Sequence, residues 1–109
     1  MKDHRRIDER SLAFGRAIAA RLPGQVELIE QAQVTIGRWL ETCSPSLRPA
    51  LLEWAAALAG PLDGVVWLLT SVDERATRLR QSNPFAGVLS PHERTQILRK
   101  FQSYDAAST

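Results

Sequence analysis

The cysteine and histidine side chains, which could act as a nucleophile or as metal ligands, are few in this sequence: Cys43, His4 and His92. A reactive thiolate needs a neighbouring base, and none can be identified for Cys43, which ends an apolar stripe where a small buried side chain is expected. The histidines lie near opposite ends of the chain, and neither has a cysteine or histidine at the spacing of a metal site. The sequence therefore predicts no metal, no cofactor and no enzymatic activity, and Cys43 is the one residue whose mutation would test for catalysis.

Carboxylates and glycines support no other chemistry. Glu27 with Glu30, and Asp73 with Glu74, are pairs on helix faces whose neighbours are basic, so a solvated surface accounts for them. The six glycines are scattered singly and form no phosphate-binding loop. Small all-helical domains without a cofactor motif seldom assemble a catalytic site, which favours a binding function.

Length and composition predict one soluble domain. A chain of 109 residues with 44% hydrophobic and 24% charged residues should fold around a single core, so residues 1–109 form one predicted domain, frayed at about 1–5 and 105–109. A single cysteine and a charged N-terminal stretch favour the cytoplasm, and the paucity of lysine relative to arginine is typical of a GC-rich bacterial genome. The nearly uncharged stretch 49–72 is divided into pieces too short to span a bilayer.

Four stretches before residue 82 carry apolar residues at helical spacing. The first ends at Pro23–Gly24, the second runs from Gln25 to about Ser44, the third covers 50–59 after Pro49, and the fourth covers about 62–81. Their apolar stripes are Ile7, Ser11, Phe14, Ile18 and Leu22; Ile29, Ala32, Ile36, Leu40 and Cys43; Leu51, Ala55, Leu58 and Leu62; and Val65, Leu69, Val72, Ala76 and Leu79.

The segment 82–101 has the clearest local signals. Asn83 before Pro84 is a plausible helix end, since asparagine tolerates the left-handed conformation and a residue before proline resists the helical one. Ser90 and Glu93 then read as a capping box that starts a fifth helix. The apolar residues of this helix, Ile97, Leu98, Phe101 and Tyr104, form a narrow stripe, so it should lie against the body with one side only. The predicted fold is all-α, a compact antiparallel bundle of four to five short helices.

The third and fourth predicted helices form a hairpin that is apolar on more than one face. Trp67 points nearly opposite the stripe of its own helix, and Leu52 and Trp54 flank the stripe of theirs. The hairpin could be buried within the monomer, with Phe85, Val88 and Leu89 as a lid, or part of it could meet another polypeptide. We favour the second alternative, because a chain this short has little material left to wrap a two-sided hairpin.

Two functions follow as hypotheses. The first is a small regulatory or adaptor protein that binds itself, as a homodimer, and an unidentified protein through an apolar surface of Leu52, Trp54, Trp67, Phe85, Val88 and Leu89. The alternative is a nucleic-acid-binding protein that uses the basic residues of the fifth helix, namely His92, Arg94, Gln96, Arg99 and Lys100. The formal net charge of only +2 makes the alternative the weaker one.

Overall fold

The computed structural model describes the backbone of residues 2–85 and 87–108 and the side chains of residues 9–85 and 87–100. Within these ranges the chain forms α-helices and 3₁₀ turns and no strand, which confirms the all-α fold. The elements in chain order are α1 (Lys2–Arg21), η1 (Leu22–Gly24), α2 (Glu27–Thr42), α3 (Arg48–Ala59), α4 (Leu62–Thr70), α5 (Glu74–Leu79), η2 (Arg80–Ser82) and α6 (Pro91–Ser108).

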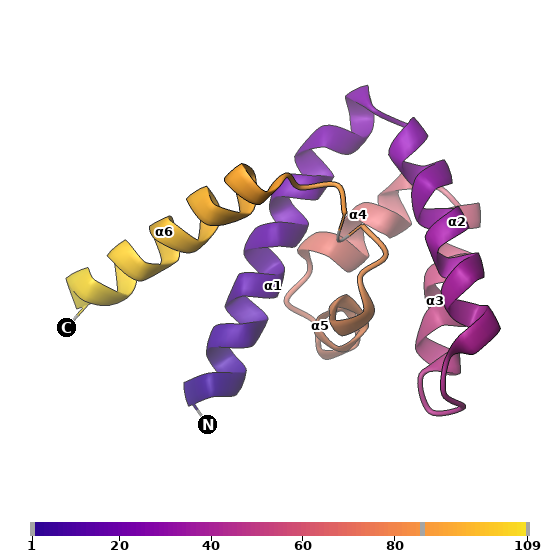
Figure 1. Ribbon diagram of the computed structural model, residues 1–109, viewed down its shortest axis with the longest axis horizontal. Helices are drawn as coiled ribbons and strands as arrows, with labels where there is room; N and C mark the ends of the chain where they lie inside the picture. Colours follow the sequence, from indigo (N-terminus) through magenta and orange to yellow (C-terminus); the bar gives the residue numbers. More distant parts are fainter. Residues whose placement is uncertain (1, 86, 109) are drawn as a thin grey trace.

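The helices are arranged around α1. Figure 1 shows α2 and α3 as an antiparallel hairpin at one side, α4 running from this hairpin to α1, and α5 between them. The last helix, α6, starts beside α1 and projects away from the rest of the protein. None of the described helices is long and apolar enough to cross a bilayer.

The core lies where α1, α3, α4 and α5 meet. Its largest fully buried side chains are Trp54, Phe85, Ile18, Leu22, Leu51, Leu68, Leu69, Leu79 and Val65. Gly15 sets the distance between α1 and α4, because a Cβ atom at this position would collide with the backbone carbonyl oxygen of Leu69. Burial of this apolar surface is the main stabilising contribution to the fold.

The predicted fourth helix is wrong, because the chain breaks at residues 71–73 into α4 and α5. The Ser71 hydroxyl accepts a hydrogen bond from the Asp73 backbone N–H (3.0 Å), and the Asp73 carboxylate caps α5 by accepting one from the Arg75 N–H (2.8 Å). Such short polar side chains offer the backbone an alternative to helical hydrogen bonds. Val72, expected in the apolar stripe, is consequently 78% exposed.

The predicted capping box at the start of α6 is confirmed. The Glu93 N–H donates to the Ser90 hydroxyl (3.2 Å), and the Ser90 N–H donates to the Glu93 carboxylate (3.0 Å). Asn83 does interrupt the helical segment as predicted, but its backbone is extended (φ −65°, ψ 116°) rather than left-handed. The restriction that Pro84 imposes on its predecessor is therefore the deciding effect.

The contact between α6 and the body is confined mainly to α1. The Arg21 guanidinium pairs with Glu93 and also donates to the Val88 carbonyl (3.3 Å), and Ile97 packs against the core. The backbone of α1 is helical from Lys2, and that of α6 is helical as far as Ser108. Residues 1 and 109, where fraying was also predicted, lie outside the described residues. The side chains of Ile7, Phe101 and Tyr104, which belong to the predicted stripes, lie outside the described side chains.

Candidate functional site

Trp54, predicted as an interface residue, lies in the core. It is 0% exposed, its indole N–H donates to the Leu79 carbonyl (2.7 Å), and its ring packs edge-to-face with that of Phe85, with centroids 6.2 Å apart. The break at 71–73 is the reason, because it folds α5 back over α3 instead of continuing α4 outward. Trp54 therefore supports the fold and is not accessible to a partner in this structure.

The predicted lid closes over the protein's own core. Phe85 and Leu89 are 1% and 5% exposed, and Val88 is half-buried. The Asn83 side-chain oxygen accepts a hydrogen bond from the Phe85 N–H (2.9 Å), which holds the start of the loop in place. Three residues of the predicted interaction surface, Trp54, Phe85 and Leu89, are thus internal, which corrects the expectation that they face a partner.

Trp67 remains at the surface, as its position on the helical wheel predicts. Its side chain is 40% exposed, and the Arg75 guanidinium lies 5.8 Å from the ring centroid. Glu53 of α3 holds Arg75 there by accepting a hydrogen bond from its Nε–H (2.9 Å). The indole is therefore covered in part by a cation that water can still reach.

Leu52 is also exposed, at 47%, but it belongs to a different part of the surface. It precedes Glu53, so it points about 100° away from it around α3, and Glu53 is the residue that faces Arg75 and the Trp67 side of the protein. The exposed members of the predicted surface thus do not converge on one patch. Scattered exposed apolar residues are common on soluble proteins and do not by themselves define a site.

A groove lies between α1 and α6, and its floor is mainly apolar. Its volume is about 650 Å³, and it is lined by Leu12, Ala13, Ala17 and Ile97, with Glu9, Arg16 and Lys100 at its rim. The four apolar residues are half-buried, and the described part of the chain leaves them open to solvent. The stripe assigned to α1 from the sequence lies on another face of the helix and gave no sign of this groove. The spacing of Leu12, Ala13 and Ala17 could have indicated it, because these positions share one helical face.

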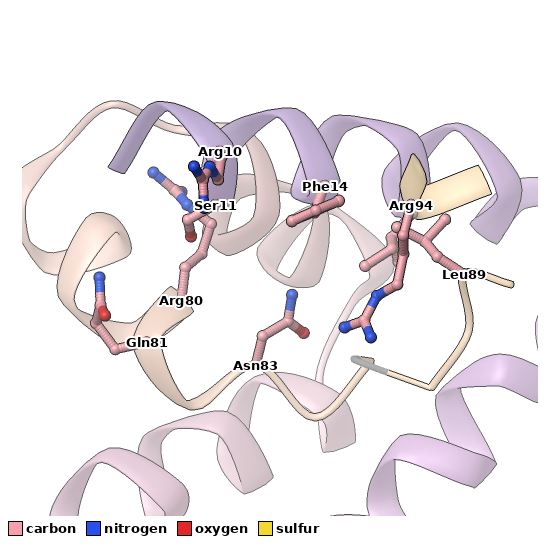
Figure 2. A pocket seen from close by; sticks show the side chains of 9 residues that line it. Arg10, Ser11, Phe14, Arg80, Gln81, Asn83, Leu89 and Arg94 are labelled. Carbon is pink, nitrogen blue, oxygen red and sulfur yellow. The ribbon is translucent and has the colours of Figure 1, made fainter. Parts of the chain in front are cut away.

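A second hollow, of about 300 Å³, lies on another side of α1 (Figure 2). We call it the arginine pocket, because three arginines from three elements line it: Arg10 of α1, Arg80 of η2 and Arg94 of α6. Its other lining residues are Ser11, Phe14, Ile18, Gln81, Asn83 and Leu89. Its lining within the described part of the chain contains no carboxylate side chain.

Four of the five residues of the nucleic-acid hypothesis share one face of α6. His92, Gln96, Arg99 and Lys100 are exposed there at helical spacings of three and four, and Lys100 also lines the α1/α6 groove. Arg94 lies apart from them and lines the arginine pocket. Besides His92, the four residues include only two basic side chains, Arg99 and Lys100, which is few for binding driven by phosphate contacts.

Cys43 is half-buried beside Trp39 and Leu47 in a hollow of about 370 Å³ that also contains Thr42, Gln81 and Ser82. Its thiol donates to the Leu40 carbonyl (Sγ to O 3.8 Å), and the side chain packs against the core. No histidine or carboxylate is present among the described residues of this hollow. A search of the described side chains for three or more potential metal ligands in one place finds none.

Comparisons of this chain with protein-family models, with curated proteins and with solved structures find no match. The function must consequently be argued from the surfaces described above, since a helical fold is compatible with many functions.

Proposed function

We propose that this chain is a non-enzymatic regulatory or adaptor protein of the bacterial cytoplasm, which acts by binding other proteins and which forms a homodimer through the α1/α6 groove. The observation that carries the proposal is the apolar floor of that groove, formed by Leu12, Ala13, Ala17 and Ile97, which the described side chains leave open. Leaving these side chains in water is unfavourable, whereas a helix laid between α1 and α6 would cover them.

A second copy of the same chain is the occupant that we expect for this groove. With 18 residues, α6 is about 27 Å long, so a helix of the second copy could lie along it. The rim carries both signs of charge, with Glu9 and Arg16 on α1 and Lys100 on α6. A two-fold axis would bring acidic and basic groups of the two copies together.

The surface around Trp67 is the place where we expect the unidentified target protein to bind. A half-exposed indole is a typical anchor of protein interfaces, and Arg75 beside it supplies a hydrogen-bonding group at the rim. This surface lies on α4 and α5, apart from the α1/α6 groove, so one protomer could bind its copy and its target at once.

Sedimentation velocity over a range of protein concentrations tests the homodimer. Ala13→Glu places a charge on the floor of the groove and should shift the protein to the monomer, because burial of an unpaired carboxylate is costly. Ala56→Glu is the matched control, since it makes the same exchange at an exposed position of α3 that does not line the groove. A native chain that sediments as a monomer, or equal effects of the two variants, would contradict the proposal.

A further inference from the structure

Two cationic side chains of the arginine pocket, Arg10 and Arg94, have no carboxylate partner among the described residues. Within the described part of the chain, Arg10 has no hydrogen bond or ion pair from its side chain, and Arg94 contacts only the ring of Phe14, with its guanidinium carbon 5.8 Å from the ring centroid. Two like charges that line one hollow of about 300 Å³ repel each other. An anion placed between them would be attracted by both, which would offset this repulsion.

The neutral polar groups of the pocket are biased toward donors. The Asn83 side-chain oxygen is already occupied by the Phe85 N–H (2.9 Å), so its amide group is left to donate. Figure 2 shows the amide nitrogen of Asn83 turned toward α1. The Ser11 hydroxyl on α1 supplies another donor. Such a set of donors complements carboxylate or phosphate oxygens.

Arg80 makes the inner wall of the pocket rigid. This side chain is only 4% exposed, and its guanidinium donates to the Leu68 carbonyl in the last turn of α4 (2.8 Å) and to the Thr77 hydroxyl (3.2 Å). These hydrogen bonds give Arg80 a structural role, since they satisfy a carbonyl that the end of α4 leaves without a helical partner. The charge of Arg80 is thereby fixed beside the pocket before any ligand enters.

The remaining walls of the pocket are apolar. Phe14, Ile18 and Leu89 line the pocket together with the arginines, and Figure 2 shows Phe14 between the arginines of α1 and α6. A volume of about 300 Å³ lies at the lower end of the range for small-molecule sites. It suits a ligand the size of one substituted ring better than a long chain or a nucleotide.

We propose that the arginine pocket binds a small organic anion, in which one carboxylate or phosphate group is attached to a compact apolar group. The anionic group lies between Arg10 and Arg94 and accepts hydrogen bonds from them and from Asn83. The apolar group packs against Phe14, Ile18 and Leu89. This site lies on a different face of α1 from the α1/α6 groove and does not depend on the homodimer.

Four probes test the site by titration of the full ¹⁵N-labelled chain, followed by amide chemical shifts. Benzoate and phenyl phosphate carry an anionic group on a ring, benzyl alcohol is a neutral counterpart, and inorganic phosphate lacks the ring. We expect the first two to bind and to shift amide signals near Ser11, Phe14, Asn83 and Leu89, and the tighter of them identifies the anionic group. Equal binding of benzyl alcohol and benzoate, or of inorganic and phenyl phosphate, would overturn the proposal.

Two variants locate the anion. Arg10→Gln and Arg94→Gln each remove one uncommitted charge from an exposed side chain and should each weaken binding by about tenfold or more. Arg99→Gln removes the same charge from an exposed position of α6 that does not line the pocket, and it should leave the affinity nearly unchanged. Equal weakening by Arg99→Gln would show that the anions respond only to the overall charge of the protein. Because Arg10 and Arg94 belong to different helices, a local effect of one variant on folding does not remove the test.

Discussion

Replacing Gly15 by alanine tests the contact on which the position of α1 depends. A Cβ atom at residue 15 would collide with the Leu69 carbonyl oxygen and would lie 3.0 Å from the carbonyl carbon, so α1 and α4 would have to separate. Overpacking of this kind lowers the free energy of unfolding by about 1–3 kcal/mol. We expect a value at the upper end of this range, because the collision is with backbone atoms, which cannot move aside as a side chain can. Alanine in place of glycine within a helix returns about 1 kcal/mol, so the net loss should be about 2 kcal/mol.

Gly37→Ala is the matched control, because Gly37 is exposed in the middle of α2 and a Cβ atom there would meet nothing within 4 Å. It should raise the stability by about 1 kcal/mol. At about 4 °C per kcal/mol for a chain of this length, Tm should fall by about 8 °C for Gly15→Ala and rise by about 4 °C for Gly37→Ala. Thermal unfolding followed by circular dichroism measures both. A stabilising effect of Gly15→Ala would refute the close approach of α1 and α4.

Further predictions concern the cap, the two indoles and the binding modes. Ser90→Ala should lower the free energy of unfolding by about 1 kcal/mol. The control Ser46→Ala, in an exposed turn, should change it little, and equal urea midpoints for the two variants would argue against the capping box. Trp54→Ala should lower the free energy of unfolding by about 3–5 kcal/mol. Trp67→Ala should lower it by about 2 kcal/mol, because 40% of this residue remains exposed. Urea denaturation measures both values, and a loss for Trp67→Ala as large as that for Trp54→Ala would contradict the assigned burial. Self-association should persist when the salt concentration is raised, and a steep loss would instead favour phosphate-driven binding to nucleic acid.

The sequence predicted those parts of the fold that depend on local chemistry. Ser90 and Glu93 can satisfy each other's backbone N–H groups without any tertiary contact, so the start of α6 could be placed within one residue. Pro23, Pro49 and Pro61 likewise marked helix boundaries, because proline cannot donate a backbone hydrogen bond and restricts the residue before it.

The break between α4 and α5 was missed because apolar spacing continues across it. Ala76 and Leu79 are buried as the continuous stripe predicted, but they belong to a separate helix, α5, whose Leu79 carbonyl accepts a hydrogen bond from the Trp54 indole of α3. The available signal was local: Ser71 and Asp73 can each hydrogen-bond to the backbone two residues on.

The exposure of the two indoles shows where the helical wheel succeeds and fails. The wheel predicts the exposure of Trp67 correctly, because the direction of this side chain depends only on its position within α4. The burial of Trp54 depends on α5, whose position follows from the missed break. The α1/α6 groove and the arginine pocket depend on the angle at which α6 leaves α1, and the sequence contains no local signal for that angle.

Isotope-filtered NOE spectra of a mixture of ¹³C-labelled and unlabelled chains test most directly whether the α1/α6 groove is an interface. We predict intermolecular NOEs to the methyl groups of Leu12, Ala13 and Ile97, which line the groove, and none to Leu58 or Leu69 of the core. If no intermolecular NOE appears at these methyl groups at concentrations where the chain sediments as a dimer, the interface lies elsewhere. This result would contradict the proposed function of the groove.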